Sequence, residues 1–215
     1  MNKELRKRII TSVILFVAAT SCIFIHKIIF ITALFGISII CFKEWCNINY
    51  KYFSKKFWNY FLIKIFGLLY IFIFFVSAFL LRGSSYETSF FFTYLLLICI
   101  CSDIGGYFCG KVIGGKKLTR ISPNKTLSGT LGSFIFCILP LFIFNFDFST
   151  KNILFCLIIS FSCQLGDLFI SYFKRLNKVK DTGNILPGHG GLLDRIDGII
   201  FVMPVAVILK SSTIF

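Results

Sequence analysis

Long apolar runs separated by short polar stretches form the main pattern of this chain. Windowed hydropathy places the runs at roughly 9–25, 28–42, 61–81, 90–109, 131–147, 152–173 and 196–213. About 20 apolar residues are enough for a helix to cross a hydrocarbon core of roughly 30 Å. The runs lack the period-two alternation that a membrane β-barrel needs. The pattern therefore predicts an all-α polytopic integral membrane protein with about seven transmembrane helices, the second of them short enough to be tilted or re-entrant.

The polar stretches are too short to fold as a soluble domain, and the sequence shows no internal repeat. We therefore expect a single membrane domain over residues 1–215, with N-terminal hydrophobic helices in 1–90 and the chemistry in the C-terminal half, 91–215. Basic residues followed by the first apolar run resemble a signal peptide, but the many later runs favour an uncleaved first helix.

If each apolar run crosses the membrane, positive charge is distributed unevenly between the two sides of the membrane. Most of the 23 Lys and Arg lie in the N-terminus and in the polar stretches after the second, fourth and sixth runs. The positive-inside rule then predicts a cytoplasmic N-terminus, and an odd number of spans places the C-terminus outside.

Composition excludes several classes of protein. A hydrophobic fraction of 57% and a mean hydropathy of +0.86 are too high for an ordinary soluble domain. The net charge of +14 lies in short clusters between apolar runs, which favours anionic lipid head groups and a phosphorylated substrate over nucleic acid. The nine cysteines lack a CxxC pair or metal-binding spacing, so we expect neither disulfides nor zinc.

Two of the nine acidic residues lie inside apolar runs, beside small residues. These are Asp103, before Gly105 and Gly106, and Asp167, after Gly166. A carboxylate in the membrane is costly and is expected to have a partner or a function, the alternative being a structural hydrogen bond or ion pair between helices. The other acids outside the last 50 residues are predicted to be solvated at membrane edges: Glu4, Glu44, Glu87 and Asp147.

A loop rich in glycine and lysine follows the fourth apolar run. It runs from Gly110 to Lys117 and continues into a Ser-Pro-x-Lys-Thr element, and its candidate ligand residues are Lys116, Ser122, Lys125 and Thr126. Glycines let backbone amides approach an anion, and lysines neutralise it, so the loop suits a nucleoside triphosphate. It lacks the Walker spacing, and a basic cytoplasmic loop is already expected from topology alone.

The richest polar segment is 171–197, named here the signature segment. Its candidate residues are Lys174, Arg175, Lys180, Asp181, His189, Asp194, Arg195 and Asp197. Asp194 and Asp197 are three residues apart, so on a helix they share one face, as a divalent metal site requires. Carboxylates, basic residues and a glycine-rich turn at a membrane surface are typical of phosphoryl or nucleotidyl transfer assisted by Mg²⁺. For His189 the alternative to a functional role is a structural role in the glycine-rich turn.

At this point the sequence resembles the phosphatidate cytidylyltransferase family. The signature segment fills every position of the family's C-terminal motif, including a small residue at Gly183, and the resemblance extends over Asp103 to Gly132. The resemblance implies formation of CDP-diacylglycerol and pyrophosphate from CTP and phosphatidic acid, in a bacterial inner membrane with the site facing the cytoplasm. The chain departs from the family at Ser128 and Ile170, where the family usually has acidic residues. The resemblance therefore implies the reaction more directly than it implies the number of bound metal ions.

The residues and the resemblance together predict a site. Asp167, Asp194 and Asp197 are expected to hold Mg²⁺ and to be catalytic with Lys174 and Arg175. Substrate binding is expected from Asp103, Lys116, Ser122, Lys125, Thr126, Lys180, Asp181, His189 and Arg195. An additional monovalent cation and a homodimer are left open. The alternatives are another CTP-using transferase of lipid head groups, a polyprenol-type lipid kinase of related architecture, which releases a nucleoside diphosphate, and a small transporter.

Overall fold

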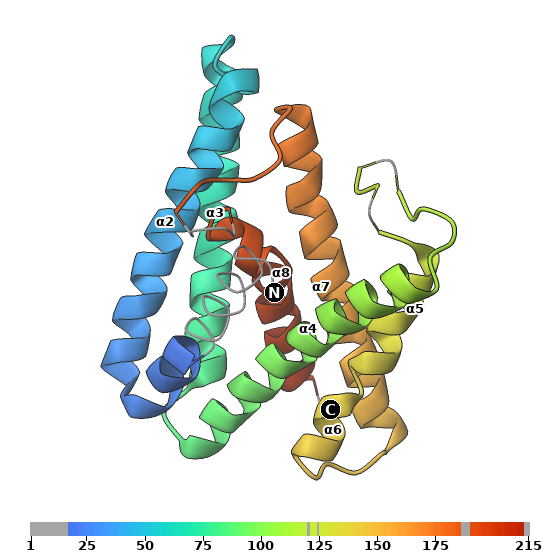
Figure 1. The fold of residues 1–215 in the computed structure, drawn as a ribbon. Coiled ribbons are helices and arrows are strands. Elements are labelled where there is room, and N and C mark those ends of the chain that lie inside the picture. The colour runs from blue at the N-terminus through green and yellow to red at the C-terminus, as the bar shows by residue number, and fades with distance from the viewer. Residues whose placement is uncertain (1–16, 120, 124, 186–189, 213–215) are drawn as a thin grey trace. The chain divides into compact units, whose positions relative to one another are not determined.

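The structure is a computed structural model that describes residues 17–119, 121–123, 125–185 and 190–212. Its helices are α2 (Lys27–Phe53), α3 (Phe57–Arg82), α4 (Tyr86–Val112), α5 (Leu127–Phe136), α6 (Leu139–Ile143), α7 (Thr150–Leu176) and α8 (Leu193–Ser211) (Figure 1). The described residues form no β-strand, and Lys117 and Thr126 form an isolated bridge. The predicted all-α fold is therefore confirmed for this part of the chain.

Four of the described helices are long and apolar enough to cross a membrane. They are Lys27–Tyr50 within α2, and the whole of α3, α4 and α7. A helix of 27 residues, the length of α4 and α7, extends about 40 Å at 1.5 Å per residue, which exceeds the hydrocarbon thickness. The count of seven and the cytoplasmic N-terminus stay predictions, and the first run lies partly outside the described residues.

Two of the predicted runs have the wrong bounds. The second run ends at residue 42 in the prediction, but α2 continues to Phe53. The hydropathy window falls there because of polar residues such as Glu44 and Asn49, which the fold buries. The run 131–147 is divided into α5 and α6, and the second of these begins beside Pro140, whose ring fits the first turn of a helix but not its interior.

The chain divides into two compact units, which are described separately. The first unit comprises Met1–Ser89 and Tyr172–Ile196, and the second comprises Phe90–Ser171 and Asp197–Phe215. Helices α7 and α8 each contribute to both units, because the division falls within them.

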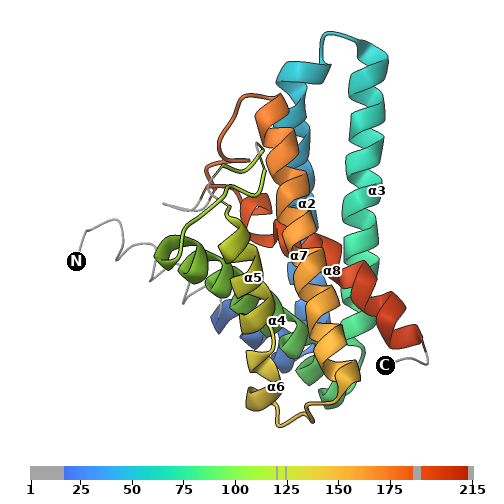
Figure 2. The ribbon, with the colours of Figure 1, turned by 90° about the vertical axis from the view of Figure 1, so that its right-hand side faces the viewer.

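In the first unit, α2 and α3 form an antiparallel pair joined by a short turn (Figures 1 and 2). Trp45 is fully buried in this pair, and its indole lies where any side chain on Gly67 would stand. Its Nε1 donates to the Ile63 carbonyl at 2.9 Å, and its ring centroid lies 4.7 Å from that of Phe173. The same face of α2 therefore packs against α3 and against the chain at the end of α7.

In the second unit, small residues let the helices approach closely. A Cβ on Gly105 of α4 would stand 2.6 Å from the Gly132 carbonyl oxygen of α5. The hydroxyls of Ser102 and Ser160 are hydrogen-bonded at 2.7 Å and join α4 to α7. Close approach through small residues and interhelical hydroxyl bonds is typical of helices packed in a membrane, where lipid supplies no hydrophobic drive for association.

Candidate functional site

Asp167 lies in α7 within the second unit and forms an ion pair with the glycine- and lysine-rich loop. Its Oδ2 lies 2.6 Å from Nζ of Lys125, and its Oδ1 accepts a hydrogen bond from Ser171 at 3.2 Å. The Asp167 and Lys125 side chains remain 34% and 26% exposed, so solvent or a ligand can reach the pair. The structure therefore brings the loop and the intramembrane acid together, and we name this pair the Asp167 site.

The loop that carries Lys125 folds back on itself. Lys117 and Thr126 form a bridge, and the Leu118 amide donates to the Lys125 carbonyl at 2.8 Å. Thr126 caps α5 by accepting from the Gly129 amide at 3.1 Å. Gly114 and Gly115 have φ values of +66° and +111°, which residues with a side chain rarely adopt. Gly114 and Gly115 therefore allow the chain to turn within this loop, and the N-cap of α5 holds the end of the loop in place.

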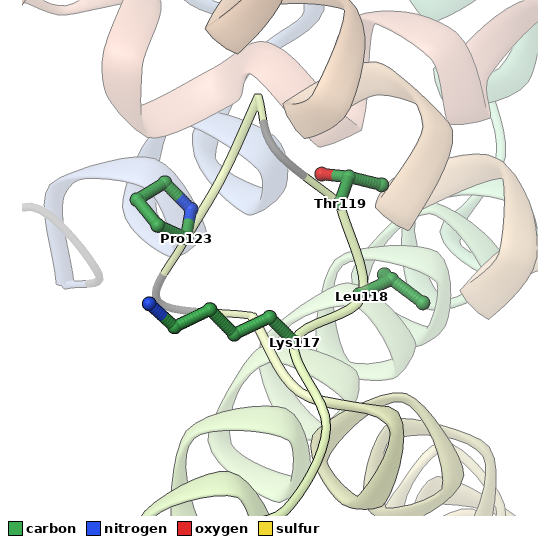
Figure 3. A pocket seen from close by; sticks show the side chains of 4 residues that line it. All are labelled: Lys117, Leu118, Thr119 and Pro123. Atoms are coloured by element: carbon green, nitrogen blue, oxygen red, sulfur yellow. The ribbon is translucent and has the colours of Figure 1, made fainter.

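A cavity of about 400 Å³ opens in this loop, lined by Lys117, Leu118, Thr119 and Pro123 (Figure 3). It combines an ammonium group and a hydroxyl with two apolar side chains. Of the predicted binding residues here, Lys116 is exposed, and the Ser122 amide donates to Thr119 Oγ1 at 3.2 Å.

The second unit also contains Asp103 and Asp197. Asp103 is exposed on α4, and its Oδ1 lies 4.0 Å from the Cys163 thiol. Asp197 Oδ1 accepts from the Gly198 amide at 2.8 Å. A Cβ on Gly166 would collide with the Asp197 carbonyl, so α7 and α8 are in close contact beside Asp167 and Asp197.

In the first unit, Asp194 accepts four hydrogen bonds, an arrangement that we name the Asp194 site. Its Oδ1 receives Nζ of Lys174 at 2.7 Å. Its Oδ2 receives the Thr182 amide at 2.7 Å, the Thr182 hydroxyl at 2.9 Å and the Gly191 amide at 3.1 Å. Asp194 and Asp197 both lie on α8, so the helix that their spacing predicted is confirmed.

Glu44 is the acidic residue whose predicted environment is wrong. The sequence predicts a solvated side chain, but Glu44 is 3% exposed and accepts hydrogen bonds from Thr182, Leu192 and Leu193. The prediction fails because it ends the second helix at residue 42. The i, i+4 spacing of Cys41, Trp45 and Asn49 is the signal that would have continued the helix.

The other predicted residues of the signature segment lie at the surface of the first unit or outside the described residues. The exposed ones are Arg175, Lys180, Asp181 and Arg195. His189 lies outside the described residues. The structure therefore joins Lys125 to Asp167 and Lys174 to Asp194, whereas the remaining assignments stay predictions.

No group of three or more His, Cys, Asp or Glu that could hold a metal ion occurs among the residues that the structure describes. The oxygen donors nevertheless suit a hard cation, because Mg²⁺ commonly uses only one or two carboxylates together with substrate phosphates. Asp167 and Asp197 fit this use. In Asp194, as in Asp167, a lysine and further hydrogen-bond donors engage both carboxylate oxygens, so its predicted role as a metal ligand stays a prediction.

The fold and the two sites define a class, that of helical integral membrane proteins that present lysine–carboxylate pairs suited to phosphorylated ligands. Sequence comparison narrows this class. The pattern of the cytidylyltransferase family matches residues 51–213, so the chain belongs to the cytidylyltransferase family, and the resemblance found in the sequence is confirmed.

Curated relatives agree with this family. The chain is 47% identical over 123 residues to the phosphatidate cytidylyltransferase of Staphylococcus aureus (strain COL), an alignment that covers 54% of this chain and 47% of that protein. It is 44% identical over 121 residues to the phosphatidate cytidylyltransferase of Bacillus subtilis (strain 168), covering 52% and 45%. The enzyme of the same name from Rickettsia bellii (strain RML369-C) is 41% identical over 131 residues, covering 54% and 57%. The chain spans about half the length of the curated relatives it matches.

Proposed function

We propose that this chain is a phosphatidate cytidylyltransferase, which transfers the cytidylyl group of CTP to phosphatidic acid and releases pyrophosphate. The observation that carries the proposal is the Lys125–Asp167 ion pair, held at 2.6 Å within the segment that the family matches. An ammonium group that lies on a carboxylate and remains partly exposed can exchange that partner for a phosphate oxygen. The names of the curated relatives supply the substrates.

The lysines and the arginine would neutralise the negative charge of the phosphates and would not act as general acids or bases. Lys125 in the second unit and the exposed Arg175 in the first would each bind phosphate oxygens, while Asp194 would hold Lys174 in its position within the first unit. The attacking phosphate of phosphatidic acid is already ionised at neutral pH, so the reaction needs no dedicated general base. Positioning and charge stabilisation supply most of the catalysis in transfers at phosphorus.

Mg²⁺ bound by Asp167 and Asp197 would offset the negative charge of the phosphate oxygens during transfer. The support is the chemistry of these donors and the close contact of α7 and α8 at Gly166. Binding of the cation there would compete with Lys125 for Asp167, so the lysine would be available for substrate when the cation is present.

The proposed orientation places the N-terminus and both sites at the cytoplasmic face, within a seven-span topology. The uneven distribution of Lys and Arg supports it. Alkaline phosphatase fused after Lys55 should be inactive, and the same enzyme fused after Gly83 should be active, because only an exterior fusion folds. The reverse pattern would invert the topology.

The reaction is tested by pyrophosphate release from the purified protein in detergent with phosphatidic acid, CTP and Mg²⁺. Release that requires all three and falls at least about a hundredfold in Asp167→Asn supports the proposal. Glu87→Gln is the matched control, because it makes the same carboxylate-to-amide change at an exposed residue. Release of a nucleoside diphosphate instead would identify a lipid kinase, and absence of any release from folded protein would refute the proposed reaction.

A further inference from the structure

Glu44 places a buried carboxylate against the signature segment, although α2 lies far away in sequence. Its Oε2 receives the Leu193 amide at 2.8 Å and the Thr182 hydroxyl at 3.0 Å, and its Oε1 receives the Leu192 amide at 3.0 Å. Only 3% of Glu44 is exposed. A buried carboxylate is costly unless hydrogen bonds replace its hydration, and three donors around one carboxylate provide them.

The two amides belong to the start of α8, which begins at Leu193. The first amides of a helix have no partner within it and carry its positive end, so a carboxylate at this place stabilises them. In most helices such a group comes from the residue just before the helix. Here it comes from another helix, and Glu44 therefore fixes where α8 begins.

Thr182 joins Glu44 to the Asp194 site. Its hydroxyl lies 3.0 Å from Glu44 Oε2 and 2.9 Å from Asp194 Oδ2, so one hydroxyl proton serves two carboxylates. Asp194 in turn holds Lys174 at 2.7 Å. The contacts run without interruption from Glu44 through Thr182 and Asp194 to the ammonium group of Lys174.

Two glycines of the signature segment make this approach possible. A Cβ on Gly183 would lie 2.7 Å from Glu44 Oε1, and a Cβ on Gly191 would lie 2.6 Å from Glu44 Oε2. Neither carboxylate oxygen could keep its present hydrogen bonds beside a methyl group at that distance. The space left by these glycines is occupied by the Glu44 carboxylate.

We infer that Glu44 is a positioning residue for the proposed cytidylyl transfer: it holds the start of α8 and Thr182, and through them sets the place of Asp194 and Lys174. The inference rests on the proposed function. Glu44 precedes residue 51, where the family match begins, so the match assigns it no role.

Glu44→Gln is the sharpest perturbation, because it keeps the shape of the side chain. Its single carbonyl oxygen can replace either Oε1 or Oε2, and its NH₂ group then faces the Leu192 or the Leu193 amide, so one of these two amides always loses its acceptor. We expect hydrogen exchange of the amides of Leu192 to Asp194, measured by mass spectrometry, to become at least about tenfold faster. Pyrophosphate turnover should fall roughly 10- to 100-fold while the KM for CTP changes by less than about threefold, because misplaced groups slow the transfer more than they weaken binding.

The matched control is Glu87→Gln, which makes the same change at an exposed carboxylate and should alter neither quantity. Wild-type exchange in Glu44→Gln would overturn the inference, and so would faster exchange with unchanged turnover. If Glu44→Gln does not fold, Thr182→Val decides by turnover: it removes the hydroxyl that joins Glu44 to Asp194 and leaves Glu44 bonded to the Leu192 and Leu193 amides, so turnover should fall, and unchanged turnover would overturn the inference. A failure of the proposed function would appear in the wild type as absent pyrophosphate release, whereas a failure of this inference appears only in the comparison of variants.

Discussion

The crossing of α4 and α5 depends on Gly105, and a single methyl group there should separate the two helices. A Cβ at residue 105 would stand 2.5 Å from Phe136 Cβ and 2.6 Å from the Gly132 carbonyl oxygen. The second contact is with backbone, which cannot rotate away. Overpacking of this kind costs up to about 3 kcal/mol. Alanine also favours the helix over glycine by about 1 kcal/mol, so Gly105→Ala should lose about 2 kcal/mol net.

A matched substitution removes the helix-propensity contribution from the comparison. Gly36 lies within α2, and a Cβ added there would meet no atom of a neighbouring element within 4 Å, so Gly36→Ala gains the propensity without a collision. The two variants should therefore differ by about 3 kcal/mol, or roughly 6–12 °C in thermal midpoint for a chain of this size, followed by size-exclusion chromatography after heating in detergent. Gly106→Ala should be intermediate, because its closest atom is the Ser133 hydroxyl oxygen at 2.6 Å, which can rotate. A Gly105→Ala midpoint equal to that of Gly36→Ala would show that the crossing tolerates the methyl group and that the packing argument is wrong.

Three further predictions concern the substrate, the interior and the cysteines. Lys125→Met should raise the KM for CTP at least about tenfold, because it removes the ammonium group that lies on Asp167. Lys151→Met, at the exposed start of α7, serves as its control and should leave the KM unchanged. Equal KM values for the two variants in initial-rate measurements would contradict this role of Lys125. Ser160→Ala should lower the thermal midpoint by roughly 2–4 °C, since it removes a buried hydrogen bond worth about 1 kcal/mol, and Ser211→Ala at an exposed hydroxyl serves as its control. Dithiothreitol should leave the thermal midpoint and the migration of the protein unchanged, because all nine cysteines are free; a shift on reduction would reveal a disulfide.

The sequence predicted the helical class and singled out the residues of both lysine–carboxylate pairs, because hydropathy and motif spacing are local properties. It failed where burial of polar groups depends on partners distant in the chain. Glu44 and Asn49 lowered the hydropathy of α2, yet their polar atoms find partners in residues 177–193. No window over neighbouring residues can contain that information.

The contacts of Asp194 also depend on residues distant in the chain. Its spacing from Asp197 suggested a metal ligand, and only the fold shows that Lys174, Thr182 and Gly191 already engage its two oxygens. A motif fixes which residue types are present, but the hydrogen bonds that a carboxylate accepts depend on loops that close over it.

The contacts of Glu44 explain a property of the signature segment that the motif alone leaves unexplained. The motif requires a small residue at Gly183, and the structure supplies the reason, because the space beside that residue is taken by a carboxylate from α2. Gly191 has the same neighbour, and Thr182 and the first amides of α8 bond to it. A substitution at residue 183 should therefore depend on residue 44, since a shorter side chain there would leave room for a methyl group while giving up the bonds to α8. The space beside these glycines is occupied by a side chain from outside the matched region, so α2 takes part in ordering the signature segment.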